Sequence, residues 1–173
     1  VLPTWTTGAG TLGSYYETTS ISNTVVASGD APITYSLFSG SLPTGSTLYA
    51  NGVITGTAPV DSSSTTYSFT IEAIDAQLQG STRSFSLTIN VDAVTWVSPA
   101  NNTTYTSTAN SAIANVALSA TDAAGYAVSY SANALPTGLS LTGSNIAGTP
   151  TVIADSSTLL TATAATTNRT AVR

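Results

Sequence analysis

Apolar residues alternate with hydroxyl-bearing residues along most of the chain, and this two-residue period predicts β-strands. The clearest segments are Tyr67–Ala73 and Ser81–Val91, in which every second residue, in the latter from Phe85 onward, is aromatic or aliphatic. Turn residues separate such segments every ~8–12 residues, as in β-sandwiches. Asn51-Gly52 between two short apolar pairs predicts a hairpin. Because no segment shows helical spacing, the pattern predicts an all-β fold.

The remaining strands are expected where shorter alternating runs lie between turns. Gly8–Gly13 is expected to be a flexible turn. The other expected strands are Val1–Thr7, Ser14–Glu17, Ser20–Ala27, Ile33–Phe38, Val94–Val97, Ile113–Ala120, Val128–Ala132, Leu139–Leu141, Asn145–Ala147 and Thr158–Ala164.

A longer pattern occurs once in each half of the chain. Ile33–Thr57 and Val128–Thr149 each contain a Tyr-Ser strand, then Leu-Pro-Thr-Gly, then a strand ending in Ile-x-Gly-Thr. Trp5 and Trp96 extend the match to the start of each copy. The period of about 90 residues is domain-sized and exceeds the ~20–50 residues of solenoid units. The sequence therefore predicts two tandem domains, residues 1–92 and 93–173.

The second copy is shorter than the first at its last strand. Ala165–Arg173 is expected to form a turn that matches the first copy as far as Arg83, and nothing corresponds to Ser84–Val91. A sandwich without that strand exposes a sheet edge and part of its core. Two interpretations stay open: residues beyond Arg173 supply the strand, or another chain donates it.

Composition limits the classes of partner. Charged residues make up 6% of the chain, against about 25% in average soluble proteins, so Ser, Thr and Asn must supply the polar surface. The net charge is −5, and the basic residues are Arg83, Arg169 and Arg173. Because phosphate binding needs clustered cations, we expect no nucleic-acid partner. No apolar run approaches the ~18 residues of a membrane span, so we expect no membrane insertion.

Catalysis has little support in the residue content. Histidine and cysteine are both absent, which removes the usual general base, the thiol nucleophile and any thiolate metal site. The eight acidic residues lie singly, and the two copies do not share the carboxylate pair that glycoside hydrolysis requires. We therefore expect that the chain is not an enzyme.

The first copy carries a set of short motifs that together are similar to one family. They are Pro3-x-Trp5, Leu12-Gly13, Glu17, Asp30, Ile33-Thr34-Tyr35-Ser36, Leu42-Pro43-x-Gly45, Ile54-x-Gly56-Thr57, Tyr67-x-Phe69-x-Ile71-x-Ala73-x-Asp75 and Arg83-x-Phe85-x-Leu87. This combination resembles the immunoglobulin-like and cadherin-like (dystroglycan-type) repeats of bacterial surface proteins and of tailed-phage fibre or decoration proteins. The resemblance implies tandem Ig-like/cadherin-like β-sandwich domains, the second lacking its last strand, used as spacers or adhesive arms.

The resemblance also implies a calcium site at the domain junction, where cadherin-like repeats bind Ca²⁺. Glu17 resembles the first-strand glutamate, Asp61 the mid-domain aspartate, Asp92 a linker aspartate, and Asp122 the first aspartate of the next domain's Asp-x-Asp. Ala124 stands where the second aspartate belongs, and Ca²⁺ takes about six to eight oxygen ligands. The alternative is that these acids are solvated and keep a weakly charged surface soluble. No other cofactor is expected.

Aromatic residues suggest a second kind of contact. Trp5 and Trp96 recur at equivalent positions, which favours packing in the core or at the junction over sugar stacking. Tyr15, Tyr16 and Tyr49 are candidate glycan contacts, because one of two adjacent strand residues must point outward.

These observations lead to one main hypothesis and two alternatives. The main hypothesis is a non-catalytic structural module of a virion fibre or decoration protein, acting as a spacer and host-surface attachment arm. The alternatives are a bacterial surface adhesin or extracellular filament subunit, and a carbohydrate-binding module. The expected location is the virion surface or the extracellular cell surface. The expected partners are further copies of the chain, other virion or surface structural proteins, and host polysaccharide.

Overall fold

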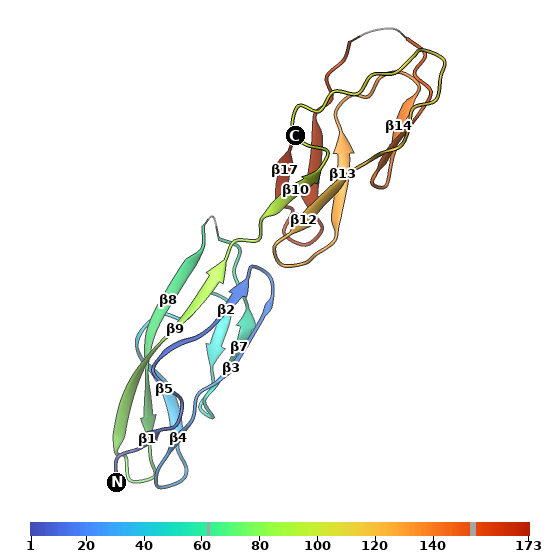
Figure 1. Ribbon diagram of the computed structural model, residues 1–173. Helices are drawn as coiled ribbons and strands as arrows, with labels where there is room; N and C mark the ends of the chain where they lie inside the picture. The colour runs from blue at the N-terminus through green and yellow to red at the C-terminus, as the bar shows by residue number, and fades with distance from the viewer. Residues whose placement is uncertain (62, 153–154) are drawn as a thin grey trace. The chain divides into compact units, whose positions relative to one another are not determined.

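The computed structural model describes residues 1–61, 63–152 and 155–173, and these residues form strands and turns without a helix (Figure 1). The chain divides into two compact units, Val1–Val91 and Asp92–Arg173. The boundary expected from the repeat, after residue 92, lies one residue later. The all-β prediction is confirmed.

The first unit contains two main sheets and one short strand pair. Its strands are β1 (Thr4–Trp5), β2 (Gly10–Tyr16), β3 (Ser20–Thr24), β4 (Ala27–Ser28), β5 (Thr34–Gly40), β6 (Ser46–Leu48), β7 (Val53–Thr57), β8 (Thr65–Ile74) and β9 (Gly80–Asn90). One sheet has the order β2-β9-β8-β5, the other has the order β3-β7-β6, and β1 pairs with β4.

The antiparallel pair β8–β9 forms the longest ladder of the first unit, running from the Thr65–Ile89 pair to the Ile74–Gly80 pair (Figure 1). Its inward positions alternate with hydroxyl-bearing residues, so that Phe85 and Leu87 of β9 are almost fully buried. They pack in one core with residues of the facing β3-β7-β6 sheet, such as Ile21 and Ile54. The alternation seen in the sequence is therefore the alternation between core and solvent.

The second unit repeats this plan, and most strands of its two main sheets are shorter than their counterparts in the first unit. They are β10 (Val94–Ser98), β11 (Val116–Ala117), β12 (Ser119–Asp122), β13 (Val128–Ala132), β14 (Leu139–Thr142), β15 (Asn145–Gly148), β16 (Leu160–Ala164) and β17 (Thr170–Val172). The sheets have the orders β13-β16-β17 and β11-β15-β14, and β10 pairs with β12. Among the described residues, no strand corresponds to the Ser84–Asn90 part of β9.

The repeated Leu-Pro-Thr-Gly and Ile-x-Gly-Thr motifs occur together because their glycines touch. A Cβ atom on Gly56 would lie 2.1 Å from the Gly45 carbonyl oxygen, and one on Gly148 would lie 2.2 Å from that of Gly138. The backbone N–H of Thr149 donates to the Gly138 carbonyl oxygen at 3.0 Å. Since no side chain fits in this approach, both glycines of each pair recur.

Each unit also contains the same aromatic corner, which we define as Trp5, Tyr35 and Arg83 in the first unit. Trp5 is buried, its ring centroid lies 5.8 Å from that of Tyr35, and the Arg83 guanidinium lies 6.0 Å from the Trp5 ring. The Tyr35 hydroxyl oxygen accepts the backbone N–H of Ala27 at 2.6 Å. These contacts hold β1, β4, β5 and β9 together.

The aromatic corner of the second unit is Trp96, Tyr130 and Arg173. The ring centroids of Trp96 and Tyr130 are 5.6 Å apart, and the Arg173 guanidinium lies 5.6 Å from the Trp96 ring. The Tyr130 hydroxyl oxygen accepts the backbone N–H of Ala120 at 2.8 Å. Packing of both tryptophans in a domain core is confirmed, and the sugar-stacking interpretation of these two rings is wrong because both are buried.

Several sequence-based boundaries are wrong for identifiable reasons. Gly10–Gly13 was expected in a turn but belongs to β2, because a parallel ladder to β9 with one bulge holds this glycine-rich segment extended. Ile113–Ala120 is not one strand, since residues 113–115 form none. The end of Ala165–Arg173 is strand β17 rather than turn. The sequence also predicts a loop at Asp61–Ser64, before the strand at Tyr67–Ala73, and Ser62 of that segment lies outside the described residues.

Candidate functional site

Glu17 and Asp61, two of the candidate calcium ligands, are in contact in the first unit. The Glu17 side chain is fully buried where β2 ends, and its Oε1 accepts the backbone N–H of Asp61 at 3.3 Å. The Tyr67 hydroxyl of β8 donates to Asp61 Oδ2 at 3.1 Å. Burial raises the pKa of Tyr67 above its usual 10.0, and the hydrogen bond and negative charge of Asp61 raise it further.

Asp92 and Asp122, the other two candidates, lie on neighbouring segments of the second unit. Asp92 is fully buried; its Oδ1 accepts the backbone N–H of Ala124 at 3.0 Å, and its Oδ2 accepts the Thr167 hydroxyl at 2.9 Å. Asp122 Oδ1 accepts the backbone N–H of Tyr126 at 2.9 Å. Its Oδ2 is buried and has no hydrogen-bond partner within the described part of the chain.

The structure therefore brings Glu17 and Asp61 into contact in the first unit and gives Asp92 and Asp122 separate partners in the second. Residues 1–61, 63–152 and 155–173 contain no group of three or more His, Cys, Asp or Glu side chains placed to hold a metal ion. The interpretation of the acids as solvated surface groups is wrong for Glu17 and Asp92, because both are buried. Their carboxylate oxygens instead accept backbone N–H or hydroxyl donors, which is how buried charges are usually compensated.

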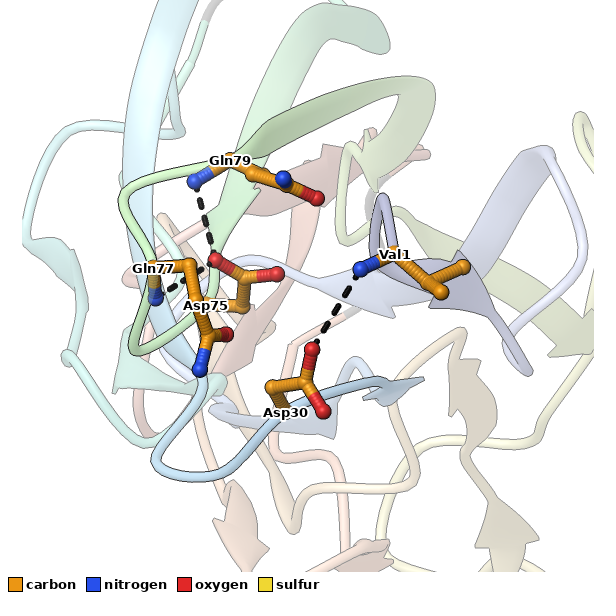
Figure 2. Close-up of polar contacts among 5 residues, drawn as sticks. All are labelled: Val1, Asp30, Asp75, Gln77 and Gln79. Carbon is orange, nitrogen blue, oxygen red and sulfur yellow. Dashed lines mark hydrogen bonds and ion pairs between the residues drawn. The ribbon is translucent and has the colours of Figure 1, made fainter.

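A third acidic arrangement, which the sequence did not single out as a site, lies at the β8–β9 turn (Figure 2). Asp75 is 3% exposed, and its Oδ1 accepts the backbone N–H groups of Gln77 and Gln79, each at 2.9 Å. Its Oδ2 is buried without a hydrogen-bond partner among the described residues. Asp30 lies nearby and pairs with the amino group of Val1 at 3.3 Å. Aspartate often begins a turn, because its side chain accepts backbone N–H groups a few residues later, and this preference could have indicated the role of Asp75.

The three candidate glycan tyrosines have different surroundings. Tyr15 is partly buried against the core, and its hydroxyl donates to Asn23 Oδ1 at 2.7 Å. Tyr16 is partly buried at the end of β2. Tyr49, in the turn after β6, is 52% exposed. None of the ring–ring contacts found among the described residues joins any two of these tyrosines.

The described residues include no helix of the length and apolar character required to cross a membrane.

Comparison with known protein families identifies the family to which this chain belongs. Residues 1–90 match the model of a family described as "Putative Ig domain". No curated protein matches the chain.

Solved structures show partial likeness. A Bacteroides fragilis protein described as a "putative alpha-galactosidase" is 27% identical over 51% of this chain, with a TM-score of 0.40, and the match covers 17% of that protein. Drosophila N-cadherin EC1-4 is 15% identical with a TM-score of 0.43, covering 99% of this chain and 48% of the cadherin. Human protocadherin-24 EC1-2 is 16% identical with a TM-score of 0.43, covering 99% and 91%.

Proposed function

The chain belongs to the putative Ig domain family, and on this premise we propose that it is a non-catalytic structural module of a surface appendage, serving as spacer and attachment arm. The observation that carries the proposal is the aromatic corner repeated in two compact units. Each corner is closed by residues of its own unit, Trp5 with Tyr35 and Trp96 with Tyr130. Two domains with self-contained cores add length to an appendage without requiring a shared site.

The surroundings of the acidic residues support the non-catalytic role. Glu17, Asp75 and Asp92 are buried, and their oxygens accept hydrogen bonds from loop backbone or hydroxyl groups. A general acid or base must instead reach a substrate in a cleft. The hollow beside Tyr130 is lined by residues such as Val128 and Leu141 and by serines, without an acidic or basic group.

The spacer role can be tested by pulling the protein from its ends. If each unit resists force by itself, the extension trace should show two unfolding events, each releasing about 30 nm, since an extended residue spans ~3.5 Å. A single event releasing about twice that length would contradict two independent spacer units.

We propose more specifically that the chain is located on the surface of a tailed phage. Its proposed partners are further copies of the chain, other virion proteins and host polysaccharide. The low charge and Ser/Thr-rich surface support this setting. Immunogold electron microscopy of phage particles and host cells tests it. Label on a virion appendage supports the phage assignment, whereas label confined to cells that carry no phage contradicts it and favours the bacterial adhesin.

A further inference from the structure

The turn between the two strands that follow the Leu-Pro-Thr-Gly motif is shorter in the second unit than in the first. Leu48 pairs with Ile54, and the equivalent Leu141 pairs with Ile146, so that five residues separate the first pair and four separate the second. Both turns lie beside the strand that carries the repeated tyrosine, β5 in the first unit and β13 in the second. The shorter turn therefore changes the surroundings of that tyrosine.

In the first unit the longer turn covers the edge of β5. The backbone N–H of Tyr35 donates to the Ala50 carbonyl oxygen at 3.0 Å. A Cβ atom on Gly52 would lie 2.3 Å from the Val25 carbonyl oxygen and 3.1 Å from the Tyr35 ring, so the turn is packed against both. No space for a ligand is left beside Tyr35.

In the second unit the same place is a hollow of about 510 Å³. Its lining residues are Val128, Ser129, Tyr130, Leu141, Gly143 and Ser144. A Cβ atom on Gly143, in the shorter turn, would have no atom within 4 Å, in contrast to one on Gly52. The hollow lies beside Tyr130 of the aromatic corner, where the two units otherwise match. Its size is in the range of small-ligand sites, about 300–1,000 Å³.

The backbone N–H of Tyr130 is a donor at this hollow. Ala127 and Asn133, on either side of it, each form a backbone hydrogen bond across to residues that flank β16. Because such bonds alternate along an antiparallel ladder, the N–H of Tyr130 points away from β16, toward the turn. It has no hydrogen-bond partner in the part of the chain that the structure describes. The equivalent N–H of Tyr35 shows that this position accommodates a carbonyl oxygen.

The remaining lining combines apolar side chains with neutral hydroxyl groups. Val128 and Leu141 are partly buried and supply the apolar surface. The Ser129 hydroxyl donates to the Thr163 carbonyl oxygen at 3.3 Å and can still accept a hydrogen bond, and Ser144 offers a second hydroxyl. No acidic or basic side chain lines the hollow, and the chain has a net charge of −5. These groups suit a neutral ligand with a small apolar group next to a carbonyl oxygen.

We propose that this hollow binds the acetamido group of an N-acetylhexosamine residue in a neutral glycan, an inference that rests on the proposed attachment role. The acetamido carbonyl oxygen accepts the N–H of Tyr130, as the Ala50 carbonyl oxygen accepts that of Tyr35. The acetamido methyl group packs against Val128 and Leu141, and the acetamido N–H donates to a serine hydroxyl. An acetamido group has the same amide geometry as the peptide unit that fills this place in the first unit.

The test is an NMR titration of the full, isotope-labelled chain with N,N′-diacetylchitobiose. The amide signals of Val128, Tyr130 and Ser144 should shift, and the acetamido methyl protons should show contacts with the methyl groups of Leu141. Cellobiose is the matched control, because it has the same linkage and lacks the acetamido groups. It should bind at least about tenfold more weakly, since one hydrogen bond and one apolar contact are lost.

Two variants locate the binding. Replacement of Thr142-Gly143-Ser144 by Tyr-Ala-Asn-Gly, the sequence of residues 49–52, restores the longer turn and should weaken binding by about tenfold or more, because a carbonyl oxygen of the protein then occupies the Tyr130 N–H. Unchanged amide signals elsewhere in the second unit show that it remains folded. Thr142→Tyr keeps the short turn and should bind within about twofold of the unaltered chain, since residue 142 is exposed.

Four results would overturn the proposal. They are the absence of shifts at up to about 20 mM disaccharide, equal binding of cellobiose, binding that the longer turn leaves unchanged, and shifts of the same amides on concentrating the protein without sugar. The last result would assign the hollow to a second copy of the chain. The extension trace tests the spacer role separately, so that two unfolding events together with any of these results would reject the acetamido site alone.

Discussion

The two units share an aromatic corner and a pair of touching glycines but differ in how far their sheets extend from them. In the first unit β8 and β9 continue for several residues past the Ile71–Arg83 pair, and both strands bury alternate residues. In the second unit β16 and β17 are short, and the equivalent Leu160–Arg173 pair lies where their ladder ends. The aromatic corner and the glycine pair are therefore compatible with different strand lengths, and the longer ladder accompanies the more deeply buried core.

This difference leads to a ranking of stability. Burial of apolar area is the main favourable term in folding, so the unit with the longer ladder should be the more stable. Tyr130, Leu139 and Leu141 of the second unit are only partly buried against its core. Substitutions at equivalent positions should therefore have unequal effects.

The largest difference is expected for Ile71→Ala and its counterpart Leu160→Ala. Ile71 is 0% exposed and Leu160 is 8% exposed, so a cavity at residue 71 has less room to relax. Truncation of a buried Ile or Leu costs about 2–5 kcal/mol, and we expect the upper part of this range for Ile71→Ala and the lower part for Leu160→Ala. The measurement is a urea titration read by pulsed hydrogen exchange, which reports each unit separately. A larger loss in Leu160→Ala would reverse the ranking.

A smaller difference is expected when the corner hydroxyls are removed. Tyr35→Phe leaves the backbone N–H of Ala27 without its acceptor in a buried site, which costs about 1–3 kcal/mol. Tyr130→Phe frees the N–H of Ala120, which is only partly buried and can recruit water, so it should cost less. Thermal unfolding of the two variants followed by calorimetry makes the comparison. Identical shifts of the two transitions would show that the corners are equally buried.

The smallest effect concerns alkaline pH. The folded-state pKa of Tyr67 is raised, mainly by burial and also by Asp61, so the folded state holds this proton more tightly than the unfolded state. The resulting stabilisation is complete below pH 10 and declines as pH rises toward the folded-state pKa. Tyr67→Phe should therefore flatten the alkaline loss of stability in the first unit. The measurement is the urea midpoint over roughly pH 9 to pH 11.5, in steps of about half a pH unit. The second unit provides the internal control, and an unchanged slope in the first unit would contradict the assignment.

The parts of the fold that depend on local pattern could be predicted from the sequence. The alternation in Tyr67–Ala73 and Ser81–Val91 anticipated β8 and β9 within a few residues, and Asn51-Gly52 does lie in the turn between β6 and β7. The motif repeat indicated two copies of one domain. Long-range pairing could not be predicted in this way. Gly10–Gly13 has turn composition and becomes a strand because β9 lies beside it.

The surroundings of the candidate site residues were less predictable. A sequence shows that Glu17 and Asp92 are charged, but burial depends on which loops fold over them, and those loops are distant in the chain. Thr167, which donates to Asp92, is one such partner. The turn role of Asp75 involves only residues close to it in the sequence and could have been predicted. The tyrosine prediction could not distinguish Tyr15, whose hydroxyl is bonded, from the exposed Tyr49.

The central claim is that the two units fold separately and that the long β8–β9 ladder makes the first unit the more stable. Native-state hydrogen exchange read by mass spectrometry tests it most directly. Amides of β8 and β9 should exchange at least about tenfold more slowly than those of β13 and β16, since each 1.4 kcal/mol of opening free energy gives a factor of ten. Added urea should release the second unit first. Equal protection in both units, lost together at one urea concentration, would contradict the claim.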